Sequence, residues 1–107
     1  MPSRIETLTK LLSAGQDNAL LRYSLANEYL KETQYADAIL HIEEAIKFNK
    51  DYSAAWKLFG KILYAAGKID DAAATYQQGI NIAKKNGDKQ AEKEMQVFLK
   101  RTEKEKQ

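Results

Sequence analysis

The feature that most restricts how this chain can fold is an internal repeat with a period of 34 residues. At this offset small residues coincide with small residues, and bulky residues with bulky ones. The coinciding pairs include Ala26 with Gly60, Ala38 with Ala72, Leu25 with Phe59, and Ile46 with Ile80. A period of about 20 to 50 residues is typical of folds in which one supersecondary unit stacks on the next. We therefore expect an array of similar units.

Both ends of the chain continue the repeat incompletely. Moved back by 34 residues, Ile42 and Ile46 coincide with Leu8 and Leu12, so the first apolar stretch corresponds to the second half of a repeat. Beyond Gly87 an offset of 36 residues aligns the chain better. We interpret this last stretch as a helix that closes the array and turns a polar face outward, as terminal repeats must.

Local signals are those of a helical chain. The only proline is Pro2, polar residues precede the apolar periodic stretches, and glycines follow several of them. The expected caps are Ser3 with Glu6, Asp17 or Asn18, Asp51, and Asp88, and the expected helix ends are Gly15, Gly67 and Gly87. We expect helices at 4–14, 19–32, 35–48, 52–66, 69–85 and 88–104.

Composition excludes several classes of function. The 17 Lys and Arg residues against 15 Asp and Glu give a net charge of +2, which is too small for general attraction to nucleic acid or membranes. The chain has no Cys and no apolar stretch of signal-peptide or membrane-span length, so we expect a cytoplasmic protein. It also lacks phosphate-binding, nucleophile-elbow and HExxH motifs, and we expect neither enzymatic activity nor a cofactor.

The single histidine, His41, does not predict a metal site. Asp37 and Glu44 lie one helical turn away on either side. A metal ion needs three or four ligands in fixed geometry, whereas a carboxylate beside a surface histidine is common. We therefore expect His41 to pair with these carboxylates.

The second copy of the repeat carries a recognisable pattern. Residues 56–60 read WKLFG, and they are followed at fixed spacing by Gly67, Ile69, Ala72 and Tyr76. This pattern resembles the tetratricopeptide repeat family, above all its small stand-alone bacterial members. The first copy departs from it, because Arg22 replaces the family's Trp and Thr33 its turn Gly.

The resemblance implies an all-α fold, a short right-handed α-solenoid of antiparallel helix pairs. We expect one domain over 1–107, with an N-terminal helix at 4–14, a first repeat at 19–52, a second at 53–86 and a capping helix at 88–104. Small residues such as Ala26, Gly60, Ala38 and Ala72 would let the paired helices approach closely while bulky residues fill the space beside them.

The resemblance also implies a concave groove, lined by the first helix of each repeat, that holds a peptide or an extended segment of a partner. Carried across by position, the groove residues are Tyr23, Asn27, Leu30, Lys57, Lys61, Tyr64, Lys93, Val97 and Lys100. Lysine pairs with carboxylates, and tyrosine supplies apolar contact with a hydrogen-bonding end. The hypothesis is a protein or peptide partner with an acidic segment; a solvated lysine face without a ligand explains the residues equally well.

A further alternative is self-association. Two repeats provide a small core, and repeat proteins usually need about three for stability. Outward faces formed by Ile5, Leu8 and Leu12, or by Met95 and Phe98, could pack against another copy. We therefore expect a monomer or a weak homodimer.

Overall fold

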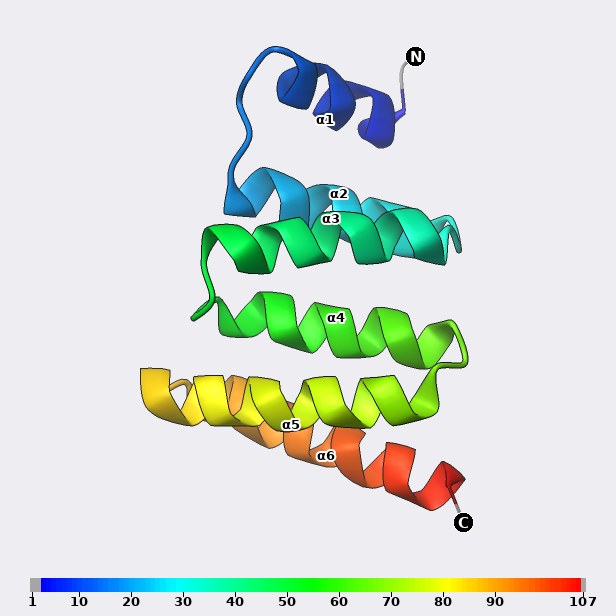
Figure 1. The fold of residues 1–107 in the computed structure, drawn as a ribbon, viewed down its shortest axis with the longest axis vertical. Helices are drawn as coiled ribbons and strands as arrows, with labels where there is room; N and C mark the ends of the chain where they lie inside the picture. The colour runs from blue at the N-terminus through cyan, green and yellow to red at the C-terminus, as the bar shows by residue number, and fades with distance from the viewer. Residues whose placement is uncertain (1–2, 107) are drawn as a thin grey trace. The chain divides into compact units, whose positions relative to one another are not determined.

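The computed structural model describes residues 3–106, which form six helices (Figure 1). They are α1 (Arg4–Ser13), α2 (Ala19–Lys31), α3 (Tyr35–Phe48), α4 (Ser53–Ala65), α5 (Ile69–Asn86) and α6 (Lys89–Glu105). Every helix begins and ends within one residue of its expected limit, and the described residues contain no strand. The all-α prediction is confirmed; the division into two repeats and two terminal helices stays a prediction.

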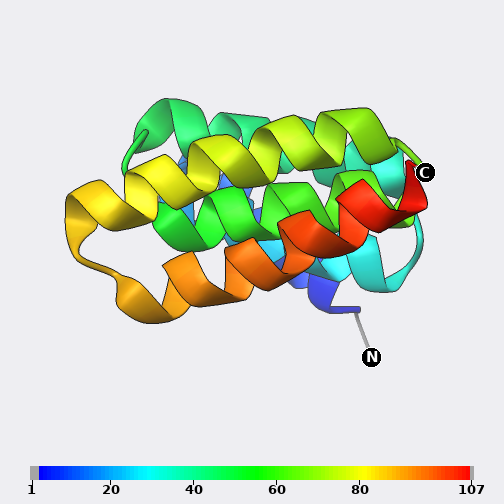
Figure 2. The ribbon, with the colours of Figure 1, turned by 90° about the horizontal axis from the view of Figure 1, so that it is seen from below.

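The helices form two compact units, an N-terminal unit (Met1–Lys50) with α1 to α3 and a C-terminal unit (Asp51–Gln107) with α4 to α6. In the N-terminal unit α2 packs along α3, and α1 packs against α2. In the C-terminal unit α5 packs extensively against both α4 and α6, whereas α4 and α6 touch over a shorter length. Figure 2 shows α5 and α6 running antiparallel on either side of their connecting turn.

Leucines join α1 to α2 in the N-terminal unit. Leu8 of α1 forms a buried cluster with Leu21 and Leu25 of α2, and Leu12 packs against that cluster. The expectation that Leu8 and Leu12 form an outward face for a second copy is therefore wrong. The apolar stripe of α1 is the side that removes hydrocarbon from water by packing on α2.

In the C-terminal unit two glycines lie where helices approach most closely. A methyl group at Gly60 of α4 would overlap the ring of Tyr76 in α5. At Gly79 of α5 it would lie 2.5 Å from the Met95 sulfur of α6 and 2.9 Å from Cβ of Trp56 in α4. These glycines let bulky side chains of one helix press onto the backbone of the next.

The apolar residues of α6 point inward. Met95 is fully buried, and the Phe98 ring lies 5.6 Å from the Tyr76 ring between centroids. The expectation that Met95 and Phe98 offer an outward face is wrong. The 36-residue offset places them on Phe59 and Ile62, and Ile62 is itself fully buried, so the inward direction of Phe98 follows from the alignment.

Three of the expected caps are present. The Ser3 hydroxyl accepts from the Glu6 amide at 3.1 Å, the Asn18 side chain from the Leu21 amide at 2.8 Å, and the Asp88 carboxylate from the Ala91 amide at 3.1 Å. These bonds satisfy amides that have no partner within their own helix.

Asp51 does not cap α4 as predicted. The N-cap residue is Tyr52, which makes no side-chain capping bond. The Asp51 carboxylate instead accepts from the Lys85 ammonium group at 3.1 Å, and the Asp51 carbonyl accepts from the Asn86 side chain at 2.6 Å. Asp51 thus anchors the chain ahead of α4 to the end of α5.

The turns after α2 and α4 use the same backbone shape with different residues. Gly67 has a φ of 80°, and Thr33, its equivalent one repeat earlier, has a φ of 55°. Glycine adopts this left-handed conformation without strain, whereas a β-branched residue does so at a cost of about 1–2 kcal/mol. The replacement of glycine by Thr33 therefore places strain in the first turn.

Replacing Thr33 with Gly is expected to raise the free energy of unfolding by about 1 kcal/mol, because the strain is relieved while some chain entropy is regained by the unfolded state. The matched change Gly67→Thr is expected to lower it by about 1–2 kcal/mol, since no atom lies within 4 Å of an added Cβ and conformation alone decides the outcome. Urea unfolding measures both; equal stability of Thr33→Gly and the parent would contradict the assigned strain.

Gly60→Ala tests the close approach of α4 and α5. Alanine stabilises a helix by about 1 kcal/mol relative to glycine. The overlap with Tyr76 is nevertheless expected to leave a net loss of about 1–3 kcal/mol in the free energy of unfolding. In a Tyr76→Leu background the same change should cost less, because the ring is gone. Thermal or urea unfolding of the four proteins in this cycle gives the coupling, and additive effects would argue against the contact.

Candidate functional site

One face of α4 carries the three residues predicted for the second repeat. Lys57, Lys61 and Tyr64 are spaced by four and three residues, which places them along one side of the helix. Lys57 and Tyr64 are half-buried, and Lys61 is exposed. We call the surface formed by this side of α4 and the neighbouring side of α6 the α4–α6 face.

Carboxylates of α6 occupy both ends of the α4–α6 face. The Lys57 ammonium group donates to Glu94 at 3.2 Å, and the Tyr64 hydroxyl donates to Glu105. This bond to Glu105 is the main reason that the pKa of Tyr64 is raised. Lys61 lies between the two contacts and makes no ion pair within residues 3–106. The middle of the face therefore keeps an uncompensated positive charge.

Arg101 adds a second cation near Tyr64. Its guanidinium carbon lies 5.7 Å from the centroid of the Phe98 ring, a cation–π geometry, and its charge acts to lower the pKa of Tyr64 against the larger effect of Glu105. Arg101 is exposed. The face thus combines exposed cations with aromatic rings.

The predicted α6 residues lie beside this face. Lys93, Val97 and Lys100 are all exposed, Val97 to 57%. The residues of α6 that reach α4 are instead Glu94 and Glu105. The repeat alignment missed these two carboxylates because it treated acidic residues of the last helix as outer cap residues.

A sequence signal for the missed carboxylates exists in the spacing along α6. Glu94, Phe98, Arg101 and Glu105 follow one another at intervals of four, three and four residues, so they share one helical stripe. Phe98 packs against Tyr76, which identifies this stripe as the one turned toward the other helices of its unit. The direction of Phe98 alone would therefore have placed both carboxylates.

A small hollow of ≈ 180 Å³ adjoins the Lys57–Glu94 pair at the start of α6. At this end the Ser53 hydroxyl donates to the Asp88 carboxylate at 2.8 Å, and Asp88 also accepts from the Ala91 amide. These bonds hold the pKa of Asp88 below its usual value. The hollow is therefore bordered by groups that fasten α6 to α4.

The three residues predicted for the first repeat form a separate surface on α2. Tyr23, Asn27 and Leu30 are half-buried and spaced by four and three residues, so they share one side of that helix. Leu20, three residues before Tyr23, is 66% exposed. This surface of the N-terminal unit combines apolar, hydroxyl and amide groups and carries no charge among these four residues.

A polar cluster in the N-terminal unit surrounds Arg22. Its guanidinium group binds both carboxylate oxygens of Asp17, at 2.7 and 2.9 Å, and donates to Nδ1 of His41 at 3.0 Å. The His41 ring stacks on Tyr29 at 5.4 Å between centroids. Among the described residues His41 makes no hydrogen bond or ion pair with Asp37 or Glu44, whose charges only act to raise its pKa. Nδ1 is instead bound by Arg22, which replaces the repeat's Trp.

The Arg22 cluster shifts three pKa values. The hydrogen bond with Arg22 lowers the pKa of Asp17, and the same bond raises that of Arg22. Burial, followed by the nearby charge of Arg22, lowers the pKa of His41. Because a guanidinium group can only donate, His41 must accept at Nδ1 in its neutral form.

Two kinds of site are not found within the part of the chain that the structure describes. Among residues 3–106 no three His, Asp or Glu side chains are grouped so that they could hold a metal ion. None of the six helices is long and apolar enough to cross a membrane.

Comparison with known proteins identifies similar chains. A family model described as tetratricopeptide repeat matches residues 29–93. The TPR repeat-containing protein PA0015 of Pseudomonas aeruginosa is 45% identical over 97 residues, which are 91% of this chain and 92% of that protein. The similarity therefore extends beyond the residues that the family model matches.

Two solved structures are also similar to this chain. Protein BPP2914 from Bordetella parapertussis is 38% identical, with a TM-score of 0.88 over 98% of this chain and 91% of that one. A tetratricopeptide repeat domain protein from Salinibacter ruber is 31% identical, with a TM-score of 0.75 over 81% of this chain and 88% of that one. The predicted fold class, an all-α solenoid of this repeat, is confirmed.

The Arg22 cluster predicts a pH dependence of stability. The pKa of His41 is lower in the folded chain than its ordinary value of about 6.5. Between the two values the unfolded chain binds more protons, so the free energy of unfolding falls as the pH drops below about 6.5 and levels off once folded His41 is also protonated. Urea unfolding from pH 8 to pH 5 measures this loss. The His41→Gln variant should lose less over the same range, and an identical slope in both proteins would contradict the prediction.

Proposed function

Because the chain belongs to the tetratricopeptide repeat family, we propose that it is a protein-binding module whose α4–α6 face takes an acidic, extended segment of a partner. The repeat generally mediates protein–protein interaction, and its proteins are generally non-catalytic scaffolds. The chemistry of the face supports the choice of an acidic partner.

The observation that carries this proposal is the way in which α6 itself uses the face. Two glutamates of α6, Glu94 and Glu105, are held by Lys57 and Tyr64. The α4 side chains are therefore suited to carboxylates along this side of the helix, and Lys61, between the two contacts, remains exposed without one. An acidic side chain of a partner would pair with Lys61, and Lys93 and Lys100 would meet further carboxylates beside it.

The N-terminal unit has a separate surface of different chemistry on α2. Leu20, Tyr23 and Leu30 offer apolar area, and Asn27 offers an amide that can both donate and accept. Such a surface suits an extended segment, whose backbone amides and carbonyls need hydrogen-bonding partners while its apolar side chains leave water. We propose that partner residues bound to α2 are apolar or neutral, in contrast to those bound to α4.

The direct test selects ligands from a random peptide display library and titrates a selected peptide into 15N-labelled protein. The selected peptides are expected to be rich in Asp and Glu, and amide shifts are expected at Lys61, Tyr64, Lys93 and Lys100. Peptides without enrichment of acidic residues, or shifts confined to other surfaces, would overturn the proposal.

Lys61→Glu is expected to weaken binding of a selected peptide by about tenfold, equivalent to about 1.4 kcal/mol, since attraction becomes repulsion. Lys61 is the better probe than Lys57, because reversing Lys57 would also repel Glu94 and disturb α6. Isothermal titration calorimetry measures the change. Lys10→Glu on α1 is the matched control, as it makes the same charge change at an exposed helical position; an equal loss in both variants would point to general charge attraction.

A further inference from the structure

A continuous basic stripe runs along the solvent side of α6. Its five residues are separated by four, four, three and four positions along the chain, so they lie on one side of the helix. They are Lys89, Lys93, Val97, Lys100 and Lys104, all exposed. None of the four lysines makes an ion pair within residues 3–106.

Among residues 3–106 no acidic residue of the same helix makes an ion pair with this stripe, and one exposed carboxylate, Glu103, lies beside Lys100 and Lys104. Glu94 and Glu105 are turned toward α4, and Glu92 accepts from the Gln96 side chain at 3.3 Å. Four lysine charges therefore surround one exposed apolar residue, Val97.

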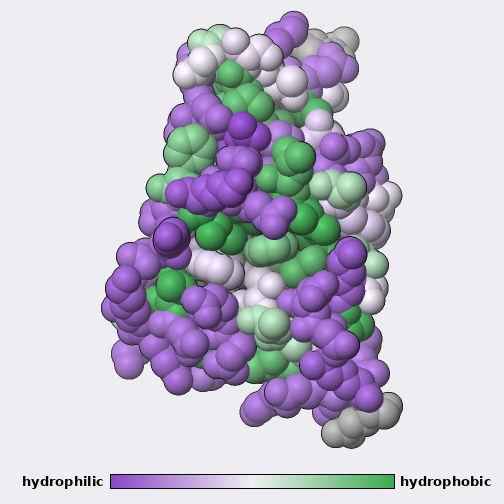
Figure 3. Space-filling model, in the orientation of Figure 1, coloured by the Kyte–Doolittle hydropathy of each residue, from purple (hydrophilic) through white to green (hydrophobic). Residues whose placement is uncertain are grey.

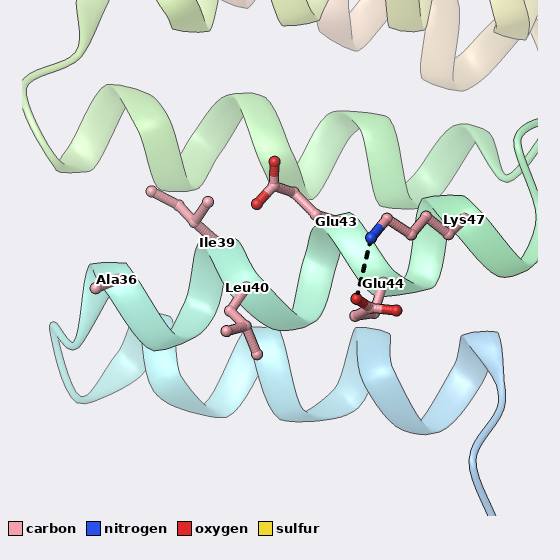
Figure 4. Close-up of a pocket in the computed structure, with 6 residues that line it drawn as sticks. All are labelled: Ala36, Ile39, Leu40, Glu43, Glu44 and Lys47. Atoms are coloured by element: carbon pink, nitrogen blue, oxygen red, sulfur yellow. Dashed lines mark hydrogen bonds and ion pairs between the residues drawn. The ribbon is translucent and has the colours of Figure 1, made fainter.

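The opposite chemistry is found on α3, in the N-terminal unit. Six residues line a hollow of ≈ 380 Å³, namely Ala36, Ile39, Leu40, Glu43, Glu44 and Lys47. Figure 4 shows Ile39 and Glu43 pointing to one side of α3, and Leu40 and Glu44 to the other. In the space-filling view the surface over α3 includes hydrophobic patches, whereas the surface over α5 is largely hydrophilic (Figure 3).

Of the three charged residues that line this hollow, Glu44 and Lys47 pair with each other and Glu43 is available. Glu43 is exposed and makes no ion pair within the described residues, and Asp37, one turn before Leu40, is exposed as well. Glu44 is partly neutralised by Lys47, at 3.3 Å (Figure 4). Leu40 is 54% exposed at the centre. We call this surface the α3 acidic face.

We propose that the basic stripe of α6 in one copy docks on the α3 acidic face of a second copy. Each surface has an exposed aliphatic residue at its centre, with lysines beside Val97 on α6 and the carboxylates of Glu43 and Asp37 beside Leu40 on α3, where Lys47 is paired with Glu44. Val97 can enter the hollow beside Leu40 while Lys100 and Lys93 pair with Glu43 and Asp37. This inference rests on the proposed function in one respect, because it identifies a second copy of the chain as the partner whose carboxylates bind Lys93 and Lys100.

The contact is expected to be weak and sensitive to salt. One helix lying on another covers less surface than the roughly 1,200 Å² of a stable interface. Its ion pairs are exposed, so screening reduces their attraction as ionic strength rises. The two surfaces differ, so the contact makes open chains of copies unless it occurs twice across a twofold axis.

Sedimentation velocity of the full chain over a concentration range, at low and at high salt, tests the proposal with a charge exchange. Glu43→Lys and Lys100→Glu are each expected to weaken self-association at least about fivefold. An equimolar mixture of the two variants should associate again, because the stripe of the Lys100→Glu variant then meets the α3 acidic face of the Glu43→Lys variant with opposite charges. The unsubstituted surfaces of the same two copies attract each other as in the wild type. Far-UV circular dichroism checks that each variant keeps its helicity.

Each result of these experiments either supports or overturns the proposed contact. Loss in each variant with recovery in the mixture supports it. A wild-type protein that stays monomeric at low salt, association that survives both changes, or loss in each variant without recovery in the mixture overturns it. Cosedimentation of the monomeric wild type with anionic phosphatidylserine vesicles, abolished by Lys100→Glu, would assign the stripe to a membrane surface instead. Lys61→Glu separates the two proposals, since it should weaken peptide binding and leave self-association unchanged.

Discussion

The close approach of helix backbones at small residues is the constraint on which the rest of this structure depends. At Gly60 the ring of Tyr76 lies where a methyl group would be, and at Gly79 the side chains of Met95 and Trp56 do the same. Because α5 can press against both neighbours at once, α4 and α6 are brought near enough for their side chains to meet. The pairs that define the α4–α6 face are therefore consequences of two missing side chains in α4 and α5.

The α4–α6 face illustrates how a helical cap can shape a binding surface. Glu94 pairs with Lys57 at one end, Glu105 accepts from the uncharged Tyr64 hydroxyl at the other, and Lys61 is exposed between these contacts. A partner thus meets a short positive region bounded by glutamates and not a uniform basic surface. Such a boundary limits where acidic residues can be placed in a ligand, and this contributes to specificity by making other arrangements repulsive.

The helices themselves were predictable from the sequence because their signals are local. Caps such as Asn18 and Asp88 and turn residues such as Gly67 act within a few positions of the helix end, and the 34-residue repeat tied two copies together. Long-range partners were not predictable in this way. Asp51 had the sequence of a cap but pairs with Lys85, and the choice between those partners depends on where α5 ends. Glu94 is different, because the 36-residue offset turns Phe98 inward and Glu94 lies on the same stripe of α6.

A single substitution in a repeat can also change the interactions that are made at its position. The position of Trp56 is filled by Arg22 in the first copy, and a guanidinium group there requires partners that a tryptophan does not. Asp17 and His41 supply them, so a place that holds an aromatic ring in one copy holds a hydrogen-bonded guanidinium group in the other. The sequence showed that Arg22 replaces the tryptophan but not which residues would bind its guanidinium group.

The attachment of α1 has a consequence for the dynamics of the N-terminal unit. Within that unit, among the described residues, α1 packs on α2 and not on α3, mainly through Leu8 and Leu12. An element with so few buried contacts separates from its neighbours at a lower free energy than the pair beside it. Amide hydrogens of α1 would therefore exchange with solvent earlier than those of α2 and α3. Each such opening uncovers Leu21 and Leu25, so a transient apolar surface accompanies the native state.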